Sequence, residues 1–477
     1  MTTSGPTTGS RGPLLRRPDL DSVYSINPDG SRNFLQPTDV HGRWQTRKKL
    51  VWAILIAVYA VIPWIEIGGH PAVLFDIPHR SAYLFGFTFT RDDFYLVFFL
   101  LTGVGFTLFA ITALFGRVWC GYACPQTVFL EGIARRLERW IEGSRAERVR
   151  RNKGPWNFEK IWRKAAKFVS FAALALLVAH IFLAYFIPAR ELWHVTTSAP
   201  SAHPFAFGFT MALAGILFFD FAWFREQLCI VICPYGRLQS ALIDDDTVII
   251  GYDQRRGEPR AKPAKGQAAE GKGDCIDCMN CVAACPTGID IRNGLQLECV
   301  GCMNCIDACD DVMRKIGKPE GLIRYDSKNA FEGKPRRFVR PRLFFYAALG
   351  LVGLTVFLLT ASGRNSFEAT QRRARGLPYV LTEGTLRNVL IVHVRNKTDQ
   401  DQRYTLKAAL PQGSPGSSFA FELAETEITL AALASTDVAL TATLLREEYK
   451  GRFPILVTVT GKDGAETVDV ELQFIGP

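Results

Sequence analysis

Apolar residues in this chain are concentrated in long blocks that interrupt a polar background. Five of these blocks approach the about 20 helical residues that are needed to cross the hydrocarbon core of a bilayer. They are Leu50–Ile65, Phe94–Phe115, Ala165–Ile187, Phe205–Phe224 and Leu343–Thr360. We therefore predict an α-helical membrane domain of five spans, in which the first block is the shortest and contains Pro63.

A different pattern begins at about Arg387, where apolar and polar residues alternate in short runs. Such a period of two is typical of β-strands with one buried face. The seven runs are Val389–Val394, Tyr404–Leu410, Phe419–Leu423, Thr426–Leu430, Val438–Leu444, Ile455–Thr460 and Val468–Phe474. They predict a small antiparallel Ig-like β-sandwich. Because this segment contains no cysteine and no catalytic constellation, we expect it to contact a partner, and a purely stabilising cap is the alternative.

Lys and Arg residues are unevenly distributed among the connections between the predicted spans. Residues 116–164 carry 12 of them, whereas the loops 66–93 and 188–204 carry two and one. Because basic loops stay in the cytoplasm, the N-terminus and residues 225–341 are predicted to be cytoplasmic, and the C-terminal segment lies outside. This distribution also accounts for the net charge of +10, and no nucleic-acid recognition motif accompanies it.

Eight of the 12 cysteines fall into two runs between Cys275 and Cys309. The first run has the spacing C-x2-C-x2-C-x3-C-P, in which three thiolates bind one cluster and the fourth binds the other. We assign Cys275, Cys278, Cys281 and Cys309 to one [4Fe-4S] cluster, and Cys299, Cys302, Cys305 and Cys285 to a second. A pair of zinc knuckles is the alternative, but zinc sites favour two C-x2-C pairs. Asp310 departs from the pattern, because it stands where the first run has Pro286.

The other four cysteines form a second repeat. W-C-G-Y-A-C-P-Q contains Cys120 and Cys124, and C-I-V-I-C-P-Y, 109 residues later, contains Cys229 and Cys233. Each C-x3-C-P motif follows an even-numbered span, which indicates a duplicated helical hairpin, and each proline disfavours helix at the cysteine before it.

If the duplicated hairpins pack side by side, the four thiols form one shared site. Helix packing by inert cysteines is the alternative. Soft thiolates favour Cu(I), so a copper site, a third cluster and a thiol relay are all compatible with this spacing.

Together these motifs resemble the CcoG family, also called FixG or RdxA, of accessory proteins for assembly of cbb-type cytochrome c oxidase. The resemblance implies a multi-pass protein of the bacterial inner membrane that reduces Cu(II) to Cu(I), with copper chaperones, oxidase assembly factors and the oxidase as partners. By this resemblance, Cys120, Cys124, Cys229 and Cys233 are required for copper reduction. The eight downstream cysteines are the cluster ligands.

With this resemblance the chain divides into five predicted segments. They are a flexible cytoplasmic N-terminal arm (1–45), a membrane domain with four spans (46–252), a cytoplasmic ferredoxin-like domain (253–335), the fifth span (336–362) and a periplasmic Ig-like β-sandwich (363–477). No signal peptide is expected, because residues 1–40 lack an apolar core.

Two other functions fit the same residues. One is a quinol-oxidising electron-transfer subunit, because the layout also resembles the membrane polyferredoxins of nitrate respiration. The other is a non-enzymatic assembly scaffold or copper carrier. The chain has no flavin or nicotinamide fingerprint, so the electron donor stays open with quinol as one candidate, as does the oligomeric state, for which a homodimer is one option.

Overall fold

A computed structural model describes residues 34–477 apart from 79, 91–92, 263–270, 364, 374–376, 399, 411–417, 462–463 and 465. A flexible arm is expected at residues 1–45, and residues 1–33 of it lie outside the described residues. The chain forms two compact units, one of Met1–Leu74 with Leu100–Leu354 and one of Phe75–Phe99 with Thr355–Pro477. The ferredoxin-like segment and most of the membrane helices thus belong to the same unit.

Among the described residues, four helices are long and apolar enough to cross a membrane, which indicates that the protein associates with one. They are α2 (Phe94–Phe115), α7 (Phe158–Leu183), α9 (Pro204–Phe219) with its π-helical extension η4 (Asp220–Phe224), and α15 (Pro341–Ser362). These helices correspond to the second to fifth predicted spans. A crossing of the membrane by each of them, and its direction, stay predictions.

The first predicted span is a helix, but it is not one of these four. Helix α1 (Arg43–Val61) is followed by the 3-10 turn η1 (Ile62–Trp64), which contains Pro63. Its first turns carry Arg43, Arg47, Lys48 and Lys49, which leaves too short an apolar stretch behind them. Five spans therefore also stay a prediction.

The N-terminus of α1 is bound to the ferredoxin-like segment. The Asp307 carboxylate accepts hydrogen bonds from the backbone N–H groups of Trp44 (3.3 Å) and Gln45 (2.8 Å). A helix leaves its first N–H groups without partners inside the helix, so Asp307 satisfies two of them from another part of the chain.

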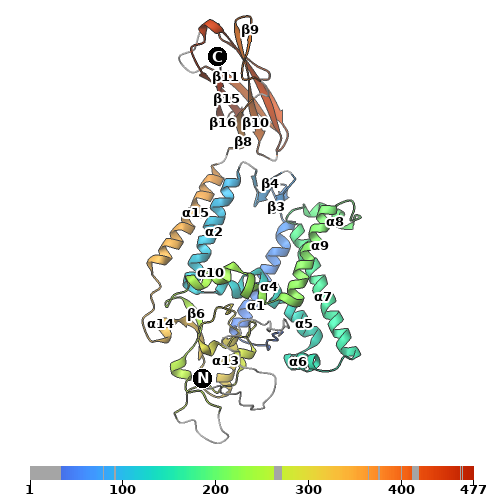
Figure 1. Ribbon diagram of the computed structural model, residues 1–477, viewed down its shortest axis with the longest axis vertical. Coiled ribbons are helices and arrows are strands. Elements are labelled where there is room, and N and C mark those ends of the chain that lie inside the picture. The colour runs from blue at the N-terminus through green and yellow to red at the C-terminus, as the bar shows by residue number, and fades with distance from the viewer. Residues whose placement is uncertain are drawn as a thin grey trace, which may run out of the picture. The chain divides into compact units, whose positions relative to one another are not determined.

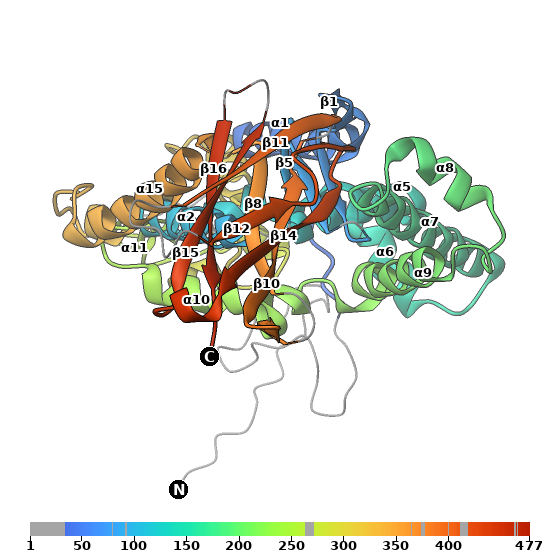
Figure 2. The same cartoon turned by 90° about the horizontal axis from the view of Figure 1, so that it is seen from above.

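The membrane helices form two close pairs. Helices α7 and α9 lie side by side (Figures 1 and 2), with Phe171 and Leu174 of α7 in a buried cluster with Phe221 of η4. Helix α2 approaches α15 through small residues, since a Cβ added at Gly103 would lie 2.8 Å from the backbone nitrogen of Leu354. Small residues at such contacts let two helix backbones come close together.

Short helices and strands connect these spans. The helical pieces are α3 (Val118–Tyr122), α4 (Pro125–Phe129), η3 (Leu130–Ala134), α5 (Arg135–Glu142), α6 (Arg145–Lys153), α8 (Ala189–Thr197), η5 (Leu228–Ile232) and α10 (Pro234–Leu242). The strands are β1 (Glu66–Ile67), β2 (His70–Pro71), β3 (Val73–Asp76), β4 (Ser81–Leu84) and β5 (Phe87–Phe89). The pieces α4 to α6 carry most of the basic residues between α2 and α7.

The ferredoxin-like segment is built on the antiparallel pair β6 (Val248–Tyr252) and β7 (Ile323–Ser327). Its helices are α11 (Gln254–Gly257), α12 (Asn280–Ala283), η6 (Ile291–Asn293), α13 (Asn304–Lys315) and α14 (Lys328–Phe331). Side chains of both strands and both cysteine runs share one buried core. Because β6 pairs with β7, this fold begins before the expected boundary at residue 253.

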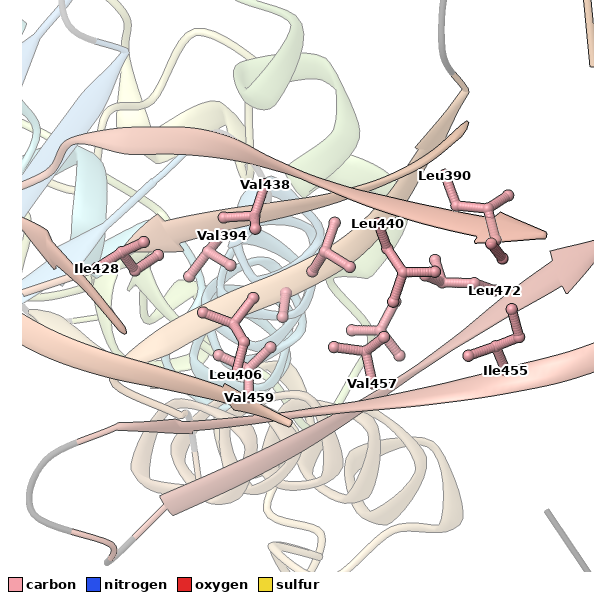
Figure 3. Close-up of a cluster of buried hydrophobic side chains, with 14 of the residues drawn as sticks. Leu390, Val394, Leu406, Ile428, Val438, Leu440, Ile455, Val457, Val459 and Leu472 are labelled. Carbon is pink, nitrogen blue, oxygen red and sulfur yellow. The ribbon is translucent and has the colours of Figure 1, made fainter. Parts of the chain in front are cut away.

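The C-terminal β-sandwich is confirmed, and Figure 3 shows side chains of both sheets meeting in its core. One sheet has the order β12-β14-β10-β8, with β9 on β10, and the other has the order β13-β11-β15-β16. The predicted runs correspond to β10 (Thr385–Asn396), β11 (Gln402–Ala409), β12 (Ala420–Leu423), β13 (Glu427–Leu430), β14 (Ser435–Leu445), β15 (Phe453–Gly461) and β16 (Glu466–Phe474). Strands β8 (Phe367–Arg373) and β9 (Val380–Thr382) were not predicted.

Candidate functional site

Two cavities in the ferredoxin-like segment are lined by thiols. One is lined by Cys275, Cys278, Cys281 and Cys309, together with apolar residues such as Ile323. The other is lined by Cys285, Cys299, Cys302 and Cys305, with Cys281 also in its wall. The structure therefore brings together the same two groups of four cysteines that the spacing predicts.

These cavities suit clusters better than single metal ions. The ligands of a cubane each bind a different iron, so they surround a cavity. Burial raises the pKa of Cys299 to about 11 and that of Cys302 to about 12, so the positive charge of bound iron would be needed to keep these thiolates ionised.

The two cysteine runs have the same backbone at equivalent positions. Met279 and Met303, each within a C-M-N-C sequence, have φ angles of 63° and 60°. A positive φ is unfavourable for a residue with a side chain. Its recurrence at both sites indicates that each loop requires this turn for its cysteines to face the cavity.

The departure at Asp310 does not displace the fourth thiol. Helix α13 continues through Asp310 to Lys315, which a proline at this position would oppose. The Asp310 side chain is buried and accepts a hydrogen bond of 2.9 Å from the backbone N–H of Gly321. Cys309 lines the first cavity beside Cys275, so the aspartate extends the helix while the thiol keeps its place.

The predicted breaks at the C-x3-C-P motifs are confirmed. Cys124 has ψ 126° and caps α4, and Cys233 has ψ 110° and caps α10. Both helices begin with the proline of the motif, which lacks the N–H that would be unpaired at a helix start. Cys120 lies in α3 and Cys229 in η5, so each motif has one cysteine before the break and one at it.

The structure also brings the two motifs together. Burial raises the pKa of Cys229, and the nearby thiols of Cys124, Cys120 and Cys233 raise it further. Burial likewise raises the pKa of Cys120 to about 12, with smaller contributions from Cys124 and Cys233. The Cys120 thiol donates to Gln239 Oε1 of the second repeat at 3.3 Å. The four thiols are thus electrostatic neighbours, as a shared site requires.

This four-thiol site contacts the second cysteine run directly. A Cβ added to Gly121, between Cys120 and Cys124, would lie 2.4 Å from the carbonyl oxygen of Gly301, between Cys299 and Cys302. Backbone therefore meets backbone at this point, and only glycine permits it.

Arg117 stabilises the contact between the Gly121 and Gly301 loops by hydrogen bonds. Its guanidinium donates to the carbonyl oxygens of Cys299 (3.0 Å) and Gly236 (2.8 Å), and also to that of Leu297. One arginine thus joins the first thiol motif, the second repeat and a predicted cluster loop.

Sequence reasoning did not single out Arg117, Gly121 or Gly301. The two glycines lie inside the cysteine motifs. A glycine at such a position can mark a close approach to another backbone segment, so these two residues could have been singled out. Nothing in the local sequence distinguished Arg117 from the other basic residues between α2 and α7.

Comparisons with known proteins agree with this architecture. The family described as a 4Fe-4S dicluster domain matches residues 224–328, and the family described as a 4Fe-4S binding domain matches residues 96–144. The family described as an Ig-like fold at the C-terminus of FixG matches residues 357–477. These three ranges include the two cysteine runs, both C-x3-C-P motifs and the sandwich.

Individual relatives extend over more of the chain. Protein RdxA of Cereibacter sphaeroides is 38% identical over 386 residues, which cover 78% of this chain and 81% of RdxA. The nitrogen fixation protein FixG of Rhizobium meliloti is 40% identical over 320 residues, which cover 65% of this chain and 61% of FixG. The crystal structure of a FixG-related protein from Vibrio parahaemolyticus covers 24% of this chain and 97% of its own, with 19% identity and a TM-score of 0.20. This chain therefore belongs to the RdxA/FixG family of iron–sulfur proteins.

Proposed function

We propose that this protein is a membrane iron–sulfur reductase that passes electrons from its two cysteine runs to the four-thiol site, where Cu(II) is reduced to Cu(I). The copper so reduced would be handed to chaperones that assemble the copper site of a cbb-type oxidase. When bound, [4Fe-4S] clusters supply electron storage and transfer over a wide range of potentials. Each copper ion takes up one electron.

The observation that carries this proposal is the contact between Gly121 and Gly301. It puts the motif of Cys120 against the loop of Cys299 and Cys302. The group held by Cys285, Cys299, Cys302 and Cys305 would therefore be the one next to the four-thiol site. The group held by Cys275, Cys278, Cys281 and Cys309 would be the one further along the relay.

The residues of the four-thiol site suit copper as a substrate. Soft thiolates bind Cu(I) more strongly than Cu(II), and this preference favours reduction of a bound ion. The half-buried thiols of Cys120, Cys124 and Cys229, whose pKa is raised by burial, stay protonated until a cation binds, and binding then releases their protons. The Gln239 side chain is fully buried and holds Cys120 in place by its hydrogen bond.

The proposal is tested with protein reduced by dithionite under anaerobic conditions and freed of excess reductant. We expect added Cu(II) to yield about one Cu(I) per electron lost, measured with a Cu(I)-specific chelator and the cluster absorbance. Cys120→Ser/Cys229→Ser should abolish Cu(I) formation while the clusters remain. Ser198→Ala/Ser201→Ala, far from any cysteine in the sequence, is the matched control. Unchanged Cu(I) formation in the cysteine variant would contradict the proposal.

A third cluster at the four thiols is a second candidate. The match of a 4Fe-4S binding family to residues 96–144 favours it, because this range contains Cys120 and Cys124. Iron and sulfide analysis separates the two candidates. Two clusters predict eight irons per chain, both in the unchanged protein and in Cys120→Ser/Cys229→Ser.

A further inference from the structure

A large cavity opens beside Cys285, which also lines one of the two thiol cavities. Its volume is about 670 Å³, within the range of pockets for small molecules and cofactors. One wall is the segment Phe34–Gln36, a second is formed by α5, α6 and α7, and a third is the turn from Cys285 to Gly288. The side chain of Leu35 covers Gly288, where an added Cβ would lie 2.8 Å from it.

The cavity carries a strong excess of positive charge. One carboxylate, that of Glu138, lines it. Six basic side chains line it as well, and they are Arg145, Lys153, Lys160, Lys164, Lys167 and Arg225. Glu138 is already shared by Arg225 (3.1 Å) and Lys167 (3.5 Å).

Two of these cations, Lys153 and Lys164, are the candidates for contact with a ligand. Lys153 is exposed and makes no ion pair with any residue that the structure describes. Lys164 pairs with Glu142 at 3.7 Å and donates a hydrogen bond of 3.0 Å to Asn152 Oδ1, so a ligand would share its ammonium with these two groups. Burial and the charge of Lys167 lower the pKa of Lys164, as expected where cations are crowded, so an anion in the cavity would relieve this repulsion.

Aromatic and apolar side chains line the rest of the cavity. Trp156, Phe168 and Phe34 contribute ring faces or edges, and the Trp156 side chain is 70% exposed. The ammonium of Lys160 lies 4.8 Å from the centre of the Trp156 ring. The site therefore offers cations and ring surfaces together, next to a thiol of a predicted cluster.

We propose that this cavity binds the electron donor, and that the donor is a phosphate-bearing compound with a redox-active aromatic ring, of the chemical class of flavin mononucleotide. This inference rests on the proposed function. The phosphate would pair with Lys153 and Lys164, and the ring would lie against Trp156 near Cys285. A neutral quinol suits the site less well, because it carries no charge to pair with the cations. A reduced flavin would give one electron to each of the two clusters and release two protons to solvent, which leaves the oxidised flavin.

Binding is tested with the full-length protein in nanodiscs of neutral lipid, using the fluorescence of flavin mononucleotide and of riboflavin, which lacks the phosphate. We expect flavin mononucleotide to bind at least tenfold more tightly than riboflavin. Lys153→Gln/Lys164→Gln should weaken its binding by about tenfold and leave riboflavin unaffected. Arg150→Gln/Lys315→Gln removes the same charge elsewhere and should change neither. Trp156→Leu should weaken the binding of both flavin mononucleotide and riboflavin.

Three results would overturn the inference. The first is equal binding of the two flavins, and the second is equal binding of flavin mononucleotide by the lysine variant and its control. The third is phosphatidylglycerol that copurifies with the protein, is lost in Lys153→Gln/Lys164→Gln and is not displaced by flavin mononucleotide, since the cavity would then be a lipid site. Copper reduction by dithionite-reduced protein does not need this cavity. If one of these three results were found and this copper reduction persisted, the donor site would be refuted by the binding result and the proposed function would stand.

Discussion

Lys48 is a buried cation that touches the second cysteine run. Its ammonium donates to the carbonyl oxygen of Cys302 (2.9 Å) and to Asn304 Oδ1 (2.6 Å), and the residue is 2% exposed. Burial lowers the pKa of Lys48, and the charges of Cys302 and other neighbours oppose this effect. A cation at this position favours the more negative, reduced state of whatever Cys302 holds.

We therefore predict that Lys48→Met lowers the midpoint potential of one of the two clusters. Loss of about 1.4 kcal/mol of favourable interaction corresponds to about 59 mV for one electron, so we expect a decrease of about 50–100 mV. A redox titration followed by electron paramagnetic resonance measures it. Lys49→Met, on the exposed side of α1, is the control. Equal potentials in the two variants would show that the Lys48 charge does not act on the cluster.

Glu138 connects the basic helices to the second thiol motif. Its carboxylate receives both terminal nitrogens of Arg225 at 3.1 and 3.2 Å. Arg225 has a φ of 48°, an unfavourable conformation, just after η4. Burial alone would raise the pKa of Glu138, but Arg225, Lys167 and Arg148 lower it to about 2.

We expect Glu138→Gln to destabilise the protein strongly at pH 7. Removing one partner of a buried ion pair typically costs about 3–5 kcal/mol, because the arginine stays buried without its counter-charge. Since the pKa of Glu138 is lowered on folding, its contribution is present above about pH 4.5 and is lost as the pH falls toward 2. Thermal unfolding followed by tryptophan fluorescence, at pH 7 and at a series of pH values from 4.5 down to 2.5, measures this effect.

The control for this experiment is Glu159→Gln. The side chain of Glu159 is 58% exposed and pairs with Arg163, and exposed pairs contribute about 0–1 kcal/mol. If Glu138→Gln unfolds at the same temperature as Glu159→Gln, the buried network does not support the fold.

At the scale of elements, α3 and the Cys299–Cys302 loop form the contact on which the proposed electron transfer between the two sites depends. A methyl group at residue 121 would meet the Gly301 carbonyl at 2.4 Å, so the two elements would have to separate. We predict that Gly121→Ala lowers the rate of Cu(I) formation at least tenfold while both clusters remain, measured by stopped-flow absorbance.

A matched control is available in α2. The Cβ added by Gly105→Ala meets nothing within 4 Å, so this variant should keep the full rate. Equal rates in Gly121→Ala and Gly105→Ala would contradict a route through this contact.

Elements whose conformation depends on the local sequence pattern could be predicted from the sequence. Strands that form because they pair with a distant strand were predicted less well. The α2 bounds and the breaks at Cys124 and Cys233 follow from apolar length and proline chemistry. Strand β8 has the sequence F-E-A-T-Q-R-R and no clear alternation, and it is a strand because Phe367–Arg373 pairs with β10. Its register depends on residues elsewhere in the chain, which a local pattern does not contain.

The same distinction applies to the candidate site. All 12 cysteines could be grouped from spacing, because ligand spacing is a local property. Lys48, Arg117 and Asp307 act through carbonyl and N–H groups of distant segments. Their roles follow only from the fold, and each would read in the sequence as an ordinary surface charge.

At the scale of the whole molecule, the number of spans determines where the termini lie. Five spans put the N-terminus in the cytoplasm and the C-terminus in the periplasm, whereas four would put both on one side. We predict that alkaline phosphatase fused after Pro477 is active in intact bacteria, and that green fluorescent protein fused before Met1 is fluorescent, as it is in the cytoplasm.

A fluorescent reporter at both ends is the control for this assignment. Fluorescence of the C-terminal fusion, together with inactive phosphatase at the same position, would mean that α1 does not cross the membrane. Because α15 lies between the cysteine runs and the sandwich, the cysteine runs would then lie outside the cytoplasm and the sandwich inside it.

The cap on α1 also has a consequence for biosynthesis. Gln45 precedes Asp307 by 262 residues, so α1 leaves the ribosome long before the carboxylate that completes its first turn exists. At about 5–20 residues per second, this delay is on the order of 10–50 s. The first helix of the nascent chain thus reaches its final position only after the second cysteine run has been translated. Docking of α1 therefore requires that this run is already present.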